Sequence, residues 1–315
     1  MHRPAGGLLL PQVKKIIVDG EEKAIGRPVD FAFDLDMVQL FMDISMRFPT
    51  GVVEDDGVKI TVADRCGYTA QKFKGRASSM HFISHRVEDE EDWEKYKHRL
   101  TLDLSDTARA DCESYYLHTK EYPTWEGFKQ IFNSYRQTGK FITVNVYGPW
   151  ECAWRHHGYE NSLMDLIAEP EMMGEMFEKI TDLTIATLQH MLDIGCKPDA
   201  LWLVEDMGGT HTTLFSPKIF EELLFPCHQK LAKFLHDNGM YYFTASVPDF
   251  DLVEIRRAAT IEELPDAPTR VVWRKHETGP MSKYIWAPEI HLVDGNWCIY
   301  FAAASDKPDP NGMLS

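Results

Sequence analysis

The stretch ALWLVEDMGGTHTTLFSP, residues 200–217, decides how the chain is interpreted. Ala200 to Val204 is a short apolar run, typical of a buried parallel strand covered on both faces. Ser216 with Pro217 predicts the start of a helix over 218–238. In barrels and open sheets built from such units, catalytic residues collect at the carboxyl ends of the strands. Because Glu205 and Asp206 follow the strand directly, we predict them as catalytic residues.

The rest of the chain shows two patterns. Up to 239, apolar spacing predicts a strand at 15–18, a helix over 31–46, a hairpin around 55–57, a helix from Thr124, a strand over 141–147 and helices over 162–194 broken near Pro170. Short β segments follow, with a turn at Asp294-Gly295. Such a change is typical of a domain boundary. We therefore predict an irregular segment 1–30, an α/β domain 31–239 and a β segment 240–315.

Composition limits the function classes. The chain has 315 residues, 44% of them hydrophobic, and a net charge of −16, which disfavours nucleic acid and anionic membranes as partners. A small molecule is the expected partner. No run reaches the ~18 apolar residues of a membrane span, and the N-terminal apolar stretch is shorter than that of a signal peptide. Six scattered cysteines without a C-x-x-C pair indicate reduced structural thiols. We expect a cytoplasmic protein.

Residues 140–243 resemble the uroporphyrinogen decarboxylase superfamily, which also contains corrinoid-dependent methyltransferases. The matching motifs are VYGPWECAWRHHGYENSLMDLIAEPE at 146–171, GCKPDALWLVEDMGG at 195–209 and LFSPKIFEELLFPCHQKLAKFLHDNG at 214–239. Residues 51–100 resemble the peripheral hairpin and helix of the same family. The resemblance implies a (β/α)8 TIM barrel and a lyase of porphyrin biosynthesis or a methyltransferase. We take this as the main interpretation of residues 31–239.

The resemblance also implies a substrate pocket at the strand ends. By position in the motifs, the expected substrate-binding residues of this half are Trp154, Arg155, His157, His211 and Ser216. Alternatives stay open: Ser216 suits a helix N-cap, and Arg155 and His157 suit polar cover over a strand end. The zinc motif His-x-Cys of the methyltransferases is replaced here by residues 244–246, Thr-Ala-Ser. We expect no metal and no cofactor.

From Gly239 the chain resembles family 43 glycoside hydrolases, the propeller-shaped arabinofuranosidases and xylosidases. The matching residues are GMYYFTASVPDFDLVEIRRAATIEEL at 239–264, VVWRKHETGPM at 271–281, IWAPEIH at 285–291 and DGNWCIYFAAAS at 294–305. The resemblance implies that Glu289 lines a sugar pocket and that the catalytic carboxylates lie outside this segment. We expect Trp286 to lie in the blade core.

Both resemblances are partial. An incomplete (β/α)8 barrel followed by a blade-like β segment is therefore the predicted fold class, α/β overall. Unpaired sheet edges in such a chain favour self-association. The alternatives to a decarboxylase or methyltransferase are a family 43 arabinofuranosidase or xylosidase fragment and a non-catalytic chimera joined near 239–246.

Overall fold

A computed structural model describes residues 15–24, 37–74, 80–113, 121–209, 212–236, 241–247, 249–260, 262–293 and 296–306. The chain forms two compact units, Met1–Leu231 and Ala232–Ser315. The predicted boundary at 239 lies a few residues beyond this division. None of the helices described here is long and apolar enough to cross a membrane.

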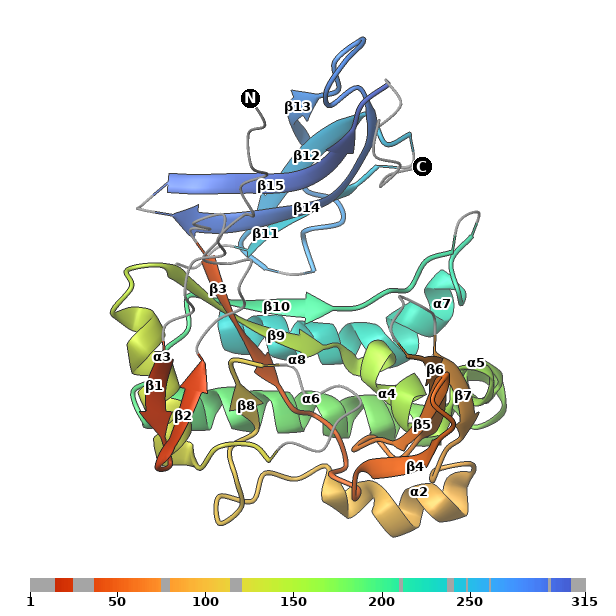
Figure 1. Ribbon diagram of the computed structural model, residues 1–315. Coiled ribbons are helices and arrows are strands. Elements are labelled where there is room, and N and C mark those ends of the chain that lie inside the picture. Colours follow the sequence, from red (N-terminus) through yellow and green to blue (C-terminus); the bar gives the residue numbers. More distant parts are fainter. Residues whose placement is uncertain are drawn as a thin grey trace, which may run out of the picture. The chain divides into compact units, whose positions relative to one another are not determined.

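A four-stranded sheet organises the first unit. Its order is β10 (Ala200–Val204), β9 (Phe141–Tyr147), β3 (Met37–Met42) and β8 (Ala110–Asp111). β9 pairs in parallel with both β10 and β3, and only β8 is antiparallel. The carboxyl ends of the three parallel strands therefore meet at one edge of the sheet (Figure 1). No closed barrel is formed by the described strands, and an incomplete barrel stays a prediction.

Helices connect and cover these strands. α4 (Pro149–His157), α5 (Tyr159–Ala168) and α6 (Pro170–Asp193) lie between β9 and β10, and the predicted break near Pro170 is confirmed. α3 (Trp125–Arg136) begins at Thr124, whose hydroxyl accepts a hydrogen bond from the Gly127 amide at 3.0 Å. After β10 the chain forms α7 (Pro217–Ile219), the π-helix η2 (Phe220–Leu224) and α8 (Phe225–Leu235).

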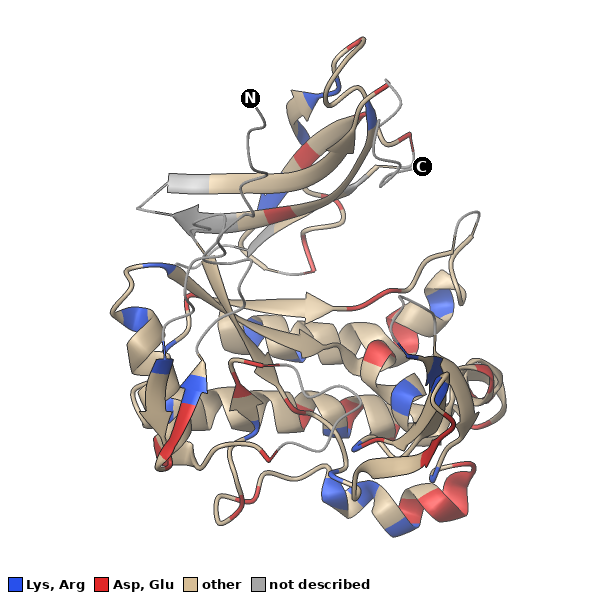
Figure 2. Cartoon of the chain, in the orientation of Figure 1, with Lys and Arg blue, Asp and Glu red and all other residues tan. Residues whose placement is uncertain are grey.

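The predicted hairpin belongs to an antiparallel sheet of β4 (Gly51–Asp55), β5 (Lys59–Ala63), β6 (Thr69–Phe73) and β7 (His81–Ser84). At the β4–β5 turn, the Asp56 carboxylate accepts the backbone N–H groups of Val58 and Lys59. Helix α2 (Glu90–Tyr96) follows with Glu90, Glu91 and Asp92 in its first turn, where the helix dipole favours negative charge (Figure 2). The 3-10 turn η1 (Lys97–Arg99) continues α2. A separate hairpin, β1 (Lys15–Val18) with β2 (Glu21–Ala24), confirms the first predicted strand.

Two predictions from the sequence were wrong. The expected helix over 31–46 contains strand β3, and residues 31–36 lie outside the described part of the chain. Val38, Leu40 and Met42 are buried alternately along β3, so the period is that of a strand, which its parallel pairing with β9 stabilises. β10 was expected to be covered on both faces, but it lies at the sheet edge and is half-buried throughout.

The second unit is built from β strands. β11 (Tyr241–Ser246), β12 (Leu252–Ala258) and β13 (Arg270–Arg274) form one antiparallel sheet, and β14 (Lys283–Val293) pairs with β15 (Asn296–Ala304) in another. The predicted Asp294-Gly295 turn lies outside the described residues. The rings of Trp273 and Phe301 pack at 4.7 Å between centroids, and the Ile285 amide donates to the Phe250 carbonyl at 3.1 Å. These contacts hold the two sheets of this unit together.

Candidate functional site

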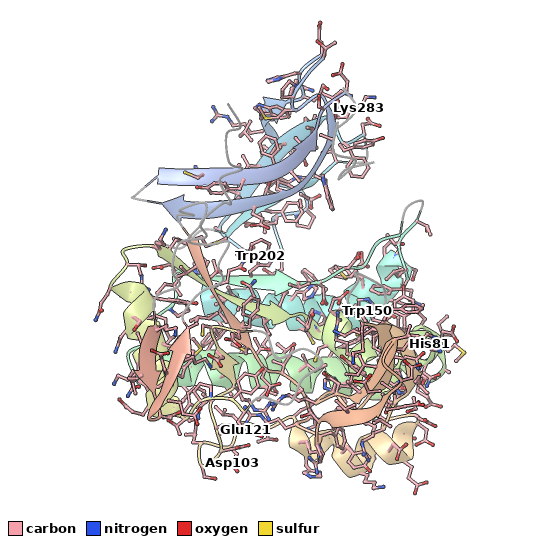
Figure 3. All side chains as sticks on the ribbon, viewed as in Figure 1. His81, Asp103, Glu121, Trp150, Trp202 and Lys283 are labelled. Carbon is pink, nitrogen blue, oxygen red and sulfur yellow. The ribbon has the colours of Figure 1, made fainter. Side chains whose placement is uncertain are left out.

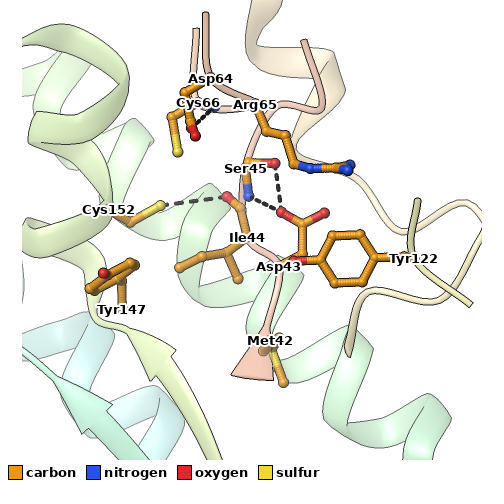
Figure 4. Close-up of a pocket in the computed structure, with 10 residues that line it drawn as sticks. All are labelled: Met42, Asp43, Ile44, Ser45, Asp64, Arg65, Cys66, Tyr122, Tyr147 and Cys152. Atoms are coloured by element: carbon orange, nitrogen blue, oxygen red, sulfur yellow. Dashed lines mark hydrogen bonds between the residues drawn. The ribbon is translucent and has the colours of Figure 1, made fainter. Parts of the chain in front are cut away.

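A small cavity lies at the carboxyl end of β3 in the first unit. It has a volume of about 60 Å³. Figure 4 shows the side chains that surround it, which include Asp43, Tyr122, Tyr147, Cys66 and Cys152. A volume of this size accommodates a few water molecules or a small ion, and it is far below the size of a pocket for a large organic substrate.

Asp43 carries the charge beside this cavity, and two arginines neutralise it. Its carboxylate accepts hydrogen bonds from the Ser45 hydroxyl at 2.6 Å and from Arg47 Nε at 2.8 Å, and Arg109 lies 4.0 Å away. Burial by itself would raise the pKa of Asp43, but Arg109 and Arg47 outweigh it and hold the pKa below its usual value. Asp43 is therefore an ionised, paired carboxylate. This cluster could not be predicted from the sequence, because Asp43 falls within the expected helix over 31–46, which the structure replaces with strand β3.

Of the two predicted catalytic acids, Glu205 caps a helix. Its carboxylate accepts the Trp150 amide at 2.9 Å and the Glu151 amide at 3.2 Å, at the start of α4, where Figure 3 labels Trp150. His228 Nε2 lies 3.2 Å from the same carboxylate. Negative charge at a helix N-terminus is stabilising, so Glu205 has a structural role in holding the start of α4. Its catalytic role stays a prediction.

The second predicted acid has a different environment. Asp206 is exposed, and its carboxylate accepts the Gly208 amide at 3.2 Å in the loop after β10. Its negative charge contributes, after burial, to the raised pKa of Tyr159. Adjacent in sequence, Glu205 and Asp206 thus face different surroundings, one a helix end and the other solvent.

The guanidinium of Arg155 is held by side chains and backbone of the same unit. Its guanidinium donates to the Glu151 carbonyl at 2.5 Å and to the Glu151 carboxylate. It also lies 3.8 Å from the centre of the Tyr147 ring and 4.1 Å from that of Trp154, an arrangement that suits the flat guanidinium. Trp154 in turn packs edge-on against Phe82. Arg155 thus stacks against Tyr147 and Trp154, and the substrate-binding role of Trp154 and Arg155 stays a prediction.

The remaining predicted residues of this unit are dispersed. His157 is buried, with Nδ1 at 3.0 Å from the Val87 carbonyl and Nε2 at 2.7 Å from the Asp165 carboxylate. The contact with Asp165 joins α4 to α5. The Ser216 hydroxyl accepts the Ile219 amide at 3.3 Å as the N-cap of α7. His211 lies outside the described residues. Within the described part of the chain, no three side chains of suitable type converge as a metal site.

The last predicted residue, Glu289, lies on β14 in the second unit. Strand pairing with β15 sets Trp286 opposite Ala302 and Glu289 opposite Tyr300. Because Ala302 and Tyr300 are two residues apart, they face the same side, and the register shift between Trp286 and Glu289 places these two there as well. Trp286 is 55% exposed and Tyr300 is 51% exposed. Trp286 therefore lies outside the core, contrary to the expectation from the sequence. We call Trp286, Glu289, Tyr300 and Ala302 the bulged face.

Two family models match the chain. Residues 232–314 match the glycosyl hydrolases family 43, and residues 131–248 match uroporphyrinogen decarboxylase (URO-D), so the two matches overlap over 232–248. Both predicted resemblances are thereby found, each over less than half of the chain. Individual curated proteins also match the chain, and they are relatives of the glycoside hydrolase part.

These relatives are arabinofuranosidases. The extracellular exo-α-(1→5)-L-arabinofuranosidase of Streptomyces avermitilis is 53% identical over 72 residues, which are 23% of this chain and 15% of that protein. The extracellular enzyme of the same name from Streptomyces chartreusis is 49% identical over 69 residues, 22% of this chain and 21% of the relative. An α-L-arabinofuranosidase of known structure from Lactobacillus brevis is 55% identical, with a TM-score of 0.23, over 25% of each chain. The chain thus spans at most about a quarter of these proteins.

The comparisons overturn two predictions. The main functional interpretation, a tetrapyrrole decarboxylase or a corrinoid-dependent methyltransferase, gives way to its alternative, because the curated relatives are arabinofuranosidases. The prediction of a cytoplasmic protein is also contradicted, because two of those relatives are named extracellular. The decarboxylase resemblance was preferred because it covers more of the chain, 131–248 against 232–314.

Proposed function

We propose that the chain is part of a family 43 glycoside hydrolase that acts on α-L-arabinofuranosides, and that the bulged face binds the sugar. The observation that carries this proposal is the identity of about half of the residues to arabinofuranosidases, over 72 and 69 residues, together with the family 43 match over 232–314. The names of two relatives also favour a protein that acts outside the cell.

The chemistry of the bulged face supports sugar binding. Trp286 and Tyr300 offer exposed rings, against which the C–H groups of a furanose pack. Glu289 lies on the same side as both rings and offers carboxylate oxygens that accept sugar hydroxyl groups. Ala302 and Ala304, the residues of β15 that face this side next to Tyr300, are small and leave space over the strand. Aromatic rings with a few polar groups are typical of the lining of small-ligand sites.

Hydrolysis makes a further demand. An inverting glycosidase needs two carboxyl groups about 6.5–9.5 Å apart, with a water molecule between them. The family resemblance places those carboxylates outside residues 239–305. The bulged face therefore accounts for binding and orientation of the sugar, and cleavage is proposed for the whole protein.

Binding of methyl α-L-arabinofuranoside, followed by calorimetry and by tryptophan fluorescence, tests the proposal. Trp286→Ala should weaken binding by about tenfold, and Glu289→Gln by a similar factor, because each loses one favourable contact. Tyr159→Ala removes a partly exposed ring from the first unit and should leave binding unchanged. If the unsubstituted chain does not bind this glycoside, or if the control variant weakens binding as much, the proposal is wrong.

A further inference from the structure

Two cysteines from different parts of the first unit face the same small cavity. Cys66 lies in the turn between β5 and β6, and Cys152 lies within α4. Both line the cavity of about 60 Å³ at the carboxyl end of β3. Figure 4 shows their sulfur atoms turned towards each other. The fold thus brings together two thiols that lie far apart in sequence.

The electrostatic environment of Cys66 indicates that the two sulfur atoms are close. Burial raises the pKa of the Cys66 thiol, and the negative charges of Asp64 and of the Cys152 thiolate raise it further. One thiolate acts on another in this way only over a short distance. Arg155 acts in the opposite direction on the pKa of both thiols, so its guanidinium also lies near the pair.

The two cysteines differ in how firmly they are held. Cys152 is buried, and its thiol donates to the Ile44 carbonyl at 3.5 Å and lies 3.5 Å from His156 Nδ1. Cys66 is half-buried and belongs to a turn, in which its amide donates to the Asp64 carboxylate at 2.9 Å. Bonded sulfur atoms are about 2.05 Å apart, and a turn adjusts to such a bond more easily than a packed helix does.

We propose that Cys66 and Cys152 form a disulfide bond, which closes the cavity and ties the β5–β6 turn to α4. The oxidant is a small-molecule disulfide such as oxidised glutathione. The Cys66 thiolate, the more accessible of the two, attacks one glutathione sulfur, forms a mixed disulfide and releases one glutathione thiolate. The Cys152 thiolate then attacks Cys66 Sγ, breaks the mixed disulfide and releases the second glutathione thiolate. Two cysteines are thereby oxidised, one glutathione disulfide is reduced, and the two thiol protons end on the two glutathione molecules.

The compartment decides whether such a bond persists. Disulfides are kept formed in oxidising, extracellular surroundings. The names of two relatives favour such a location, and only this consequence rests on the proposed function. The bond itself is inferred from the first unit. The scattered spacing of the cysteines indicated reduced thiols, because the sequence does not show which of them share a cavity.

Equilibration of the full chain with oxidised and reduced glutathione, followed by blocking of the remaining thiols and digestion with trypsin, tests the proposal. Because burial raises the pKa of both thiols, the mixture is kept mildly alkaline until the product no longer changes. Trypsin releases peptides 66–72, CGYTAQK, and 141–155, FITVNVYGPWECAWR, each with one cysteine. Mass spectrometry of the monomeric chain should find these two peptides linked, and dithiothreitol should separate them.

Matched variants separate this pairing from general oxidation. Cys66→Ser should abolish the link, whereas Cys196→Ser, which changes another buried thiol of the same unit, should leave it intact. The bond closes a long loop of the unfolded chain, so oxidation should raise the melting temperature of the helices by about 10 °C. Circular dichroism measures this shift, and Cys66→Ser should melt at the same temperature with and without dithiothreitol.

The proposal is wrong if the folded monomer keeps both cysteines open to blocking after equilibration with oxidised glutathione. It is equally wrong if Cys66 becomes linked to a different cysteine, or if the two peptides are linked only in covalent dimers. These outcomes are read from the unsubstituted chain, so a variant that fails to fold does not affect the decision.

Discussion

The pairing of Arg47 with two carboxylates of different burial gives a sharp prediction for the first unit. Arg47 Nε contacts Asp43 at 2.8 Å, and its Nη1 contacts Asp106 at the same distance. The Asp43 side chain is 4% exposed, whereas that of Asp106 is 51% exposed. The distance to Arg47 is thus matched, whereas Asp43 is more buried and has Arg109 as a second cationic neighbour.

Asp43→Asn keeps the size of the side chain but removes its charge. Arg109 then loses its anionic neighbour and Arg47 loses the more buried of its two, and breaking a buried pair in this way costs about 3–5 kcal/mol. Asp106→Asn breaks a pair open to solvent, which costs about 1 kcal/mol or less. Arg47 Nη1 also retains the Thr107 carbonyl at 3.1 Å in that variant.

Hydrogen exchange of the α6 amides in increasing urea measures the free energy of unfolding of the first unit alone. The expected difference between the two variants is several kcal/mol at pH 7. The pKa of Asp43 is lowered in the folded chain, so its contribution is present above the ordinary value of 3.8 and is lost as the pH falls below it. The gap between the unsubstituted chain and Asp43→Asn should therefore close in acid. Equal destabilisation by both variants would refute the reasoning.

Three further predictions follow from individual positions. A Cβ on Gly148 would overlap the Glu205 carboxylate, so Gly148→Ala should cost about 1–2 kcal/mol and speed exchange at the start of α4, whereas Gly51→Ala, where a Cβ meets open space, should not. Burial lowers the pKa of His156 from 6.5 to about 4, so the unfolded chain takes up a proton on this residue before the folded chain does. Between pH 7 and pH 4 the free energy of unfolding, measured in urea, should therefore fall by about 3 kcal/mol more for the unsubstituted chain than for His156→Gln. Parallel pH profiles of the two proteins would contradict this. Ala287→Gly should stabilise the second unit by up to about 1 kcal/mol, because glycine adopts the left-handed conformation without strain; a lower melting temperature would disprove it.

Local patterns were sufficient to predict the elements whose residues decide their own conformation. Thr124 as an N-cap and Pro170 as a helix break act within one turn of chain, and both predictions were confirmed. β3 was missed because its six residues are too few to separate a period of two from a period of 3.6. The parallel partner that fixes β3 as a strand lies more than 100 residues away.

The contacts of the candidate site residues also depend on parts of the chain that are distant in sequence. Glu205 could be located at a strand end from the sequence, but its contacts with the Trp150 and Glu151 amides depend on the packing of α4 against that end. Asp43 and Arg109 are 66 residues apart, and only the pairing of β3 with β8 brings them together. The motif located Glu205 at a strand end, whereas the partners of each charge required the fold.

The bulged face shows why the residues of the proposed sugar site could not be placed on one side of a strand from the sequence. Trp286 and Glu289 are three residues apart, so a regular strand would direct them to opposite sides, and an aromatic residue in an apolar run is then assigned to the core. One additional residue in β14 between them reverses this relation, and the shift between Lys283 and Trp286 brings a third position to the same side. The left-handed conformations of Tyr284 and Ala287 fall within these two shifts. Backbone strain and the convergence of the proposed sugar-binding side chains therefore have the same structural origin, and neither follows from residue spacing alone.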